Sequence, residues 1–189
     1  MKKIKKKSLV AIAFLIAITL LNISSTLAST AIYGSEEKGY IVATHQLRDN
    51  RNTFDDSSLN SKNKSYVSHA VKVWKDSGTV TFKRSTSSPN KIVTGSNKDT
   101  SVVAVCTTNF SKTTGKISKF KITLIQNKMK HISDEKNKGT VAHEFGHSLG
   151  LLDLYESYNK NQLLYGIDSR KSIKPSKKDI IGAKYCTRK

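Results

Sequence analysis

Cysteine, methionine and acidic residues are scarce in this sequence of 189 residues. With only 2 cysteines, Cys106 and Cys186, the chain can form at most one internal disulfide, which excludes a disulfide-rich scaffold. The sequence alone does not show that the two meet, so two free thiols remain the alternative. The absence of an internal repeat or a low-complexity tract excludes a repeat array and favours one globular domain.

Acidic residues number 14 against 33 lysines and arginines, which gives a formal net charge of +19. The basic residues are scattered along the chain, so a solvated basic surface is the simpler interpretation. The functional alternative is attraction to an anionic surface such as a cell wall or a membrane. Because the sequence contains no nucleic-acid recognition motif, the charge does not favour nucleic acid as a partner.

The N-terminal residues have the three-part pattern of a secretory signal peptide. Lysines are concentrated in residues 2–7, an uncharged apolar run extends from residue 9 to about residue 21, and small or polar residues follow. Cleavage is expected after Ala28 or Ala31, where small residues meet the requirement of a signal peptidase. The alternative is an uncleaved anchor, but the run is short for a membrane span. We therefore expect a signal peptide at 1–28, an N-terminal segment at 29–40 and an exported domain at 41–189.

Hydrophobic periodicity predicts both strands and helices after the signal. Apolar residues recur at helical spacing from Val67 to Trp74, and Gly78 is expected to end that helix. Residues 45–65 are polar and are expected to form a loop, and residues 128–138 a charged connector. The other predicted elements are strands at 40–43, 79–83, near 92–93, 101–108 and 117–127, a helix at 138–149, and a helix from Ser176 to about Cys186. This order indicates the α+β class.

Residues 140–153, TVAHEFGHSLGLLD, carry a pattern typical of a zinc site. Residues four apart lie on one face of a helix, so His143 and His147 can offer two imidazole nitrogens to one ion. Glu144 stays beside that ion, where its carboxylate can accept a proton from a water molecule. The simpler alternative is an ordinary buried helix whose packed face includes Phe145.

A third ligand is required, because a catalytic zinc site has three protein ligands and one open position. Gly150 lets the chain turn back after the helix, and Asp153 follows three residues later. A carboxylate oxygen is an accepted zinc ligand. The rival ligand is Asp168, but that choice would leave Gly150 without a role.

The pattern H-E-x-x-H-x-x-G-x-x-D from His143 to Asp153 resembles the metzincin zinc signature. It is similar to the variant with aspartate as the last ligand, found in some small secreted bacterial proteases. The segment 141–151 is very similar to the core of matrixin-type catalytic domains. Weaker similarities extend the resemblance over most of 41–189, at residues 67–82, 115–122 and 175–182.

Two positions depart from the matrixin pattern. Asp153 stands where the family usually has histidine, and a charged carboxylate would leave the zinc less electrophilic. The family also places a methionine in a tight turn under the metal, whereas the methionines here are Met1 and Met129. Leu164 is expected at that place, and leucine nearly conserves the volume of methionine.

The resemblance implies a twisted mixed sheet with a backing helix and an active-site helix, followed by a small C-terminal subdomain that ends in a helix. It implies a zinc metalloendopeptidase in which Glu144 is the general base for a metal-activated water. An extended protein or peptide substrate would pair with the edge strand at Val103, Ala104 and Val105. Tyr165 and Tyr158 are candidate donors to the developing oxyanion.

Calcium is common in the family, but in this acid-poor chain only the region of Asp55 and Asp56 is a candidate. The remaining histidines, His45, His69 and His131, are interpreted as structural or surface residues. We expect a monomer that is extracellular or associated with the cell wall.

Two alternatives belong to other functional classes. One is a basic exported protein that binds the cell surface on an inactive metzincin scaffold. The other is a zinc hydrolase that acts on cell-wall crosslinks. The intact Glu144 argues against an inactive scaffold, because a protein that only binds has no use for a base beside the ion.

Overall fold

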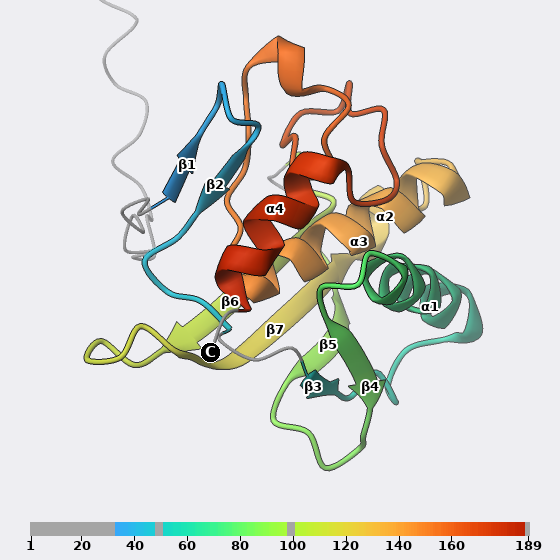
Figure 1. Cartoon of the computed structure of the whole chain (residues 1–189). Helices are drawn as coiled ribbons and strands as arrows, with labels where there is room; N and C mark the ends of the chain where they lie inside the picture. Colours follow the sequence, from blue (N-terminus) through green and yellow to red (C-terminus); the bar gives the residue numbers. More distant parts are fainter. Residues whose placement is uncertain (1–32, 48–50, 98–100, 188–189) are drawn as a thin grey trace, which may run out of the picture.

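The computed structural model describes residues 33–47, 51–97 and 101–187 (Figure 1). The expected signal peptide at 1–28 and both expected cleavage positions, Ala28 and Ala31, lie outside the described residues. None of the helices in the described ranges combines the length and the apolar character that a membrane crossing needs.

Five strands lie side by side in the order β4-β3-β5-β7-β6. Their bounds are Arg51–Phe54 for β3, Thr81–Arg84 for β4, Lys91–Gly95 for β5, Ala104–Phe110 for β6 and Ile117–Ile125 for β7. The pairs β3–β4 and β5–β7 are parallel, and β6 pairs with β7 antiparallel. A parallel bridge just after β3 joins it to the start of β5. Within the described chain β6 therefore has one unpaired edge.

Two long helices pack together beside this sheet (Figure 1). The helices are α1 at Ser61–Asp76, α2 at Gln126–Met129, α3 at Asp134–Leu149 and α4 at Lys177–Cys186, with a 3-10 turn, η1, at Ser157–Asn159. Helix α1 contacts α3 and β4, and α3 contacts β6 and β7. Helices α1, α3 and α4 begin at residues whose side chains accept a backbone hydrogen bond, Asn60, Ser133 and Ser176. This arrangement confirms the expected α+β class with a backing helix and a C-terminal helix.

An N-terminal hairpin lies apart from the sheet, against α4 (Figure 1). Its strands are β1 at Tyr33–Ser35 and β2 at Tyr40–Val42, which pair antiparallel. The hairpin links part of the expected N-terminal segment at 29–40 to the beginning of the expected catalytic domain. Strand β2 also reaches the chain that follows α3, because Val42 forms a bridge with Leu151.

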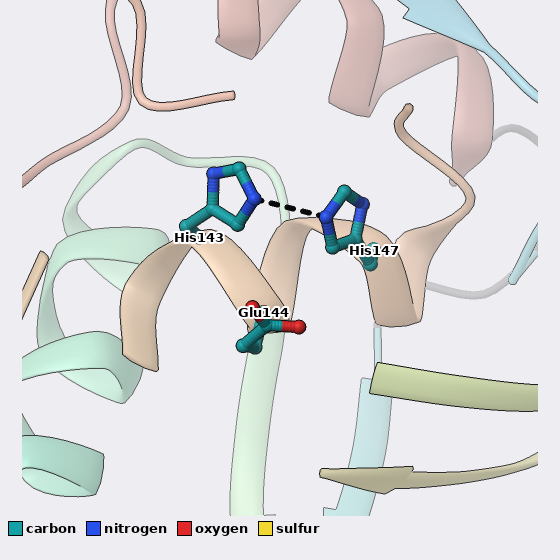
Figure 2. A group of neighbouring side chains, drawn as sticks. All are labelled: His143, Glu144 and His147. Carbon is teal, nitrogen blue, oxygen red and sulfur yellow. Dashed lines mark hydrogen bonds between the residues drawn. The ribbon is translucent and has the colours of Figure 1, made fainter. Parts of the chain in front are cut away.

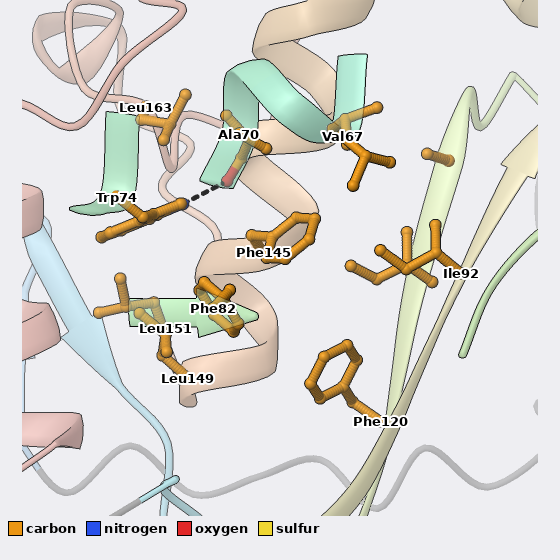
Figure 3. Packing of buried hydrophobic residues seen from close by; sticks show 14 of the residues in the cluster. Val67, Ala70, Trp74, Phe82, Ile92, Phe120, Phe145, Leu149, Leu151 and Leu163 are labelled. Carbon is orange, nitrogen blue, oxygen red and sulfur yellow. Dashed lines mark hydrogen bonds between the residues drawn. The ribbon is translucent and has the colours of Figure 1, made fainter. Parts of the chain in front are cut away.

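Aromatic packing under α3 fixes which face of that helix is buried (Figure 3). The ring of Phe145 meets Phe54 and Phe82 edge-on, with centroids 5.6 and 4.7 Å apart. Trp74 of α1 is fully buried and donates from Nε1 to the carbonyl oxygen of Ala142 at 2.8 Å. Burial of each such side chain stabilises the fold by roughly 2–3 kcal/mol. The opposite face of α3, which carries the histidines, is thereby directed away from the core.

Three details differ from the sequence-based expectations. The expected loop at 45–65 contains β3 and the first turns of α1, and the expected connector at 128–138 contains the end of α2. Helix α3 begins at Asp134, four residues before the expected start. Strand β3 reads RNTF and has no run of alternating apolar residues, so its pairing with β4 left no local signal.

Candidate metal centre

The second half of α3 carries two imidazoles that face each other, with the carboxylate of Glu144 nearby (Figure 2). His143 Nε2 lies 2.9 Å from His147 Nε2. One oxygen of Glu144 lies within 4.8 Å of a ring nitrogen of each histidine. His143 and Glu144 are both 6% exposed, and His147 is half-buried. These three residues form a cluster that could hold a metal ion.

Asp153 closes the same cluster from the loop after α3. Its Oδ1 lies 3.0 Å from His143 Nε2 and 3.5 Å from His147 Nε2. Two ligands of a tetrahedral zinc ion with bonds of about 2.0–2.1 Å are roughly 3.3–3.4 Å apart. Asp153 Oδ1 is buried and has no hydrogen-bond partner in the described chain. Two nitrogens and one oxygen at these separations fit a zinc ion with one coordination position left open.

The electrostatics of the cluster favour a cation. Burial by itself raises the pKa of Asp153, but the contacts with His143 and His147 outweigh burial and hold that pKa well below its usual range. Burial by itself lowers the pKa of His147, but the contact with Asp153 and the charge of Glu144 outweigh it and raise that pKa to about 9. The neighbouring carboxylates therefore favour a positive charge at the imidazoles, whether it is carried by a proton or by a metal cation.

Backbone carbonyl groups orient both imidazoles. His143 Nδ1 donates to the carbonyl oxygen of Leu163, and His147 Nδ1 donates to that of Leu151, each at 2.8 Å. With a hydrogen on Nδ1, each Nε2 is the nitrogen left to bind a metal. Arg170 Nη1 lies 3.0 Å from His143 Nδ1 and 3.2 Å from the carbonyl oxygen of Tyr165. Since His143 Nδ1 carries a hydrogen, it cannot accept another. The Arg170 guanidinium therefore donates to the carbonyl oxygen of Tyr165.

Gly150 ends α3 in a conformation that other residues rarely adopt. Its φ is 106°, in the left-handed region, and its backbone N–H bonds to the carbonyl oxygens of Gly146 and His147. A Cβ atom at this position would lie 2.4 Å from the carbonyl oxygen of His45. Glycine is therefore required both for the turn and for the close approach of a neighbouring segment.

Asp153 is held between two backbone anchors. Before it, Leu152 N donates to Ile41 O of β2 at 2.9 Å. After it, Leu154 N donates to Leu164 O at 2.8 Å. The sequence-based interpretation placed Asp153 as the third ligand, and the structure brings it to both histidines. The rival Asp168 lies on the rim of the cleft and is exposed, and no contact in the described chain joins it to either histidine.

The cluster lies in a cleft of about 1550 Å³. Residues 101–110, which include β6, line one side, and residues 166–173 line the other. Val103, Ala104 and Val105 all line the cleft, and Val105 is 39% exposed. The cleft therefore runs beside the strand that has an unpaired edge.

Leu164, which the resemblance places under the metal, packs against α3. It is 1% exposed. A Cβ atom added at Gly146, between the two histidines on α3, would lie 2.9 Å from Leu164 Cδ2. The carbonyl oxygen of Leu164 also anchors the loop that carries Asp153.

The expected tyrosine donors are not in the cleft. Tyr165 is 3% exposed and Tyr158 is 55% exposed, and neither lines the cleft in the described chain. Tyr155 does line it, and its hydroxyl donates to Asp153 Oδ2 at 3.3 Å. The candidate donor to the oxyanion is therefore Tyr155. The only sign of it in the sequence was its position two residues after Asp153.

The structure bears on the two cysteines, whose pairing the sequence left open. Cys106 and Cys186 are both free thiols, so the disulfide left open by the sequence is not formed. Cys106 lines the cleft, where burial and the charge of Glu144 raise the pKa of its thiol.

The candidate calcium region is occupied by ion pairs. Asp55 Oδ2 lies 2.8 Å from Lys91 Nζ, and Asp56 Oδ2 lies 2.9 Å from Arg84 Nε. Each carboxylate already has a cationic side chain as its partner. Within the described chain the residues therefore do not form a calcium site here.

Three residues near the site were missed by the sequence analysis. His45, interpreted as structural or surface, lines the cleft and stacks on Phe110 with centroids 4.4 Å apart. Arg170 and Thr140 also line the cleft and are joined by a hydrogen bond of 3.2 Å. No local spacing pointed to these residues, because distant parts of the chain bring them together. His69 binds the carbonyl of residue 173 and His131 is exposed, as expected.

Comparison with known families gives a match over much of the chain. The astacin family of peptidases matches residues 53–179, which is more than half of the chain. The matched range begins in β3 and ends in the first turn of α4, so it contains the whole cluster from His143 to Asp153. No curated protein matches the chain.

Proposed function

The chain belongs to the astacin family, a metzincin-type family of zinc metalloendopeptidases, and we propose that it is a secreted endopeptidase with Glu144 as its general base. Its substrate class is accordingly protein or peptide. One observation carries the residue assignment: His143 Nε2, His147 Nε2 and Asp153 Oδ1 converge beside Glu144 in an open cleft.

Each residue of the cluster has a separate task in this proposal. His143, His147 and Asp153 would hold zinc, which supplies a Lewis acid and lowers the pKa of a water molecule to about 7. Glu144 is buried beside them and takes the proton of the attacking water. The same carboxyl group then delivers that proton to the nitrogen of the leaving amine.

The unpaired edge of β6 is the proposed substrate-binding strand. An extended peptide that adds to this edge would form backbone hydrogen bonds with residues 103–105 and would pass the metal cluster. Exposed apolar side chains on both walls support a peptide ligand, since Val102 is 44% and Ile167 is 42% exposed. Tyr155 is the proposed donor to the developing oxyanion because it is the tyrosine whose hydroxyl already lies at the metal ligand Asp153.

Secretion belongs to the same proposal and is supported by the sequence of residues 1–28. The resemblance of the pattern from His143 to Asp153 to that of small secreted bacterial proteases also supports secretion. We propose a monomer that is extracellular or bound to an anionic cell wall through its basic surface. Mass spectrometry of the N-terminus of the exported product tests the expected cleavage after Ala28 or Ala31.

Casein cleavage by residues 29–189 tests the catalytic proposal. Glu144→Gln removes the base but keeps the side-chain shape, so we expect bound zinc to be retained and the rate to fall by about 10²–10⁴-fold. Glu135→Gln is the matched control, because Glu135 is exposed in the first turn of the same helix. Full activity of Glu144→Gln would show that Glu144 is not the base.

Two other results would lead to other functions. If the wild-type protein binds zinc but leaves casein intact, wall fragments are the next substrate, since a zinc hydrolase of crosslinks would act on them. Binding to cell walls without any cleavage would favour a surface-binding protein on an inactive scaffold.

A further inference from the structure

The turn of the β1–β2 hairpin places a carboxylate against the loop that follows the metal cluster. Glu36 Oε1 accepts a hydrogen bond from the backbone N–H of Tyr155 at 2.7 Å, and Oε2 accepts one from that of Glu156 at 3.3 Å. Asn159 Nδ2 donates to Glu36 Oε2 at 2.6 Å and to the Glu36 carbonyl oxygen at 2.9 Å. These hydrogen bonds join residues about 120 positions apart, and those to the carboxylate are of the stronger, charge-assisted kind.

The loop held by Glu36 begins at the third metal ligand. The backbone of Tyr155 is fixed by Glu36, while its hydroxyl donates to Asp153 Oδ2 at 3.3 Å. The other oxygen, Asp153 Oδ1, is the one that lies toward the two imidazoles. The hairpin is therefore connected to the ligand through one intervening residue, Tyr155.

The same hairpin also holds the chain on the other side of Asp153 (Figure 1). Ala43 N donates to Gly150 O at 2.8 Å, and Leu152 N donates to Ile41 O at 2.9 Å. Strand β2 fixes the chain before the ligand, and Glu36 fixes the chain after it. The segment from 150 to 159 is thus attached to one hairpin at both ends. That hairpin precedes residue 53, so it lies outside the range matched by the family.

We propose that Glu36 is a positioning residue for metal binding, which holds the loop of residues 153–159 so that Asp153 reaches the ion. The proposal rests on the function proposed above, in that it takes Asp153 as a ligand. It predicts that loss of the Glu36 carboxylate weakens zinc binding even though Glu36 itself does not contact the metal.

The zinc dissociation constant, measured by competition with a chromophoric chelator, tests this proposal without any cleavage assay. We expect Glu36→Ala to raise that constant by about 10–100-fold, as for other residues that orient metal ligands. Glu37→Gln is the matched control, because Glu37 is the exposed neighbour in the same turn and should leave the constant unchanged. A wild-type constant for Glu36→Ala would overturn the proposal, as would the lack of zinc binding by the wild-type protein.

A double-mutant cycle separates positioning from general damage to the fold. If Glu36 acts through Asp153, Glu36→Ala should weaken zinc binding strongly in the wild type and very little in an Asp153→Asn background. Equal, additive losses in both backgrounds would overturn the proposal. Circular dichroism of the metal-free variants checks folding, and Glu36→Gln replaces Glu36→Ala if the latter does not fold. Zinc binding without casein cleavage would count against the peptidase function alone and would leave this test intact.

Discussion

At the scale of single residues, the metal cluster depends on which atom of each side chain is left free. The carbonyl oxygens of Leu163 and Leu151 accept hydrogen bonds from Nδ1 of the two histidines, which leaves the Nε2 atoms for an ion. The Tyr155 hydroxyl donates a hydrogen bond to Asp153 Oδ2, which leaves Oδ1 for the ion. Each ligand is therefore oriented by a neighbour that is itself part of the backbone or of the adjoining loop.

The role of Asp153 as a ligand can be tested by removing its charge. Asp153→Asn keeps the shape of the side chain but replaces an anionic oxygen by a weaker neutral donor, so we expect the zinc dissociation constant to rise by at least about 10–100-fold. Equilibrium competition with a chelator measures the change. Asp168→Asn serves as the control at the exposed rival position. A larger effect at residue 168 than at residue 153 would reverse the assignment.

The sequence predicted the residues of the cluster that lie close together along the chain. Helical spacing alone places His143 and His147 on one face with Glu144 beside them, and Gly150 explains the return of Asp153. By contrast, Tyr155 has no periodic partner that would mark it as part of the site. Glu36 and Arg170 reach the site through tertiary contacts across 119 and 27 positions, and no local pattern encodes such contacts.

At the scale of secondary structure, prediction worked where an element has its own periodicity. Strand β7 alternates apolar and polar residues from Phe120 to Leu124, and it was predicted closely. Strand β3 has four residues and one buried apolar side chain, Phe54, and was expected to be loop. Its place in the sheet depends on pairing with β4 and on the bridge to β5, which are properties of the fold and not of the segment.

The end of α3 provides a test at this scale, because two glycines with positive φ differ in their surroundings. Gly150→Ala would combine an unfavourable backbone conformation with a Cβ atom 2.4 Å from the His45 carbonyl oxygen. Gly78→Ala would have the same kind of strain, at φ 72°, with nothing within 4 Å. We expect Gly78→Ala to cost about 1 kcal/mol and Gly150→Ala at least about 2 kcal/mol more.

Urea unfolding of the zinc-free proteins measures both changes as free energies of unfolding. Because Gly150 directs the chain toward Asp153, the Gly150→Ala variant should also bind zinc more weakly, whereas Gly78→Ala should bind it normally. Similar losses of stability in the two variants would mean that the turn after α3 adapts to a side chain.

At the scale of the whole molecule, the dominant feature is the excess of positive charge. The full chain has 33 basic and 14 acidic residues. Two of the ion pairs, Lys62–Asp134 and Lys72–Asp76, have side chains more than half exposed, so each stabilises the fold only weakly. We therefore expect repulsion among the many lysines to outweigh what these surface pairs contribute.

This balance predicts that salt stabilises the protein. An increase from about 0.01 to 0.15 M NaCl shortens the screening length from about 30 to 8 Å, which weakens repulsion between lysines spread over the surface. Thermal unfolding of the zinc-saturated protein should shift upward, by about 2–4 °C for each kcal/mol of repulsion removed. A variant with Lys119→Gln and Lys121→Gln, both exposed on β7, should be more stable at low salt and respond less to added salt. If salt instead lowers the unfolding temperature, the surface ion pairs are stronger than their exposure indicates. Repulsion between the lysines would then not destabilise the fold.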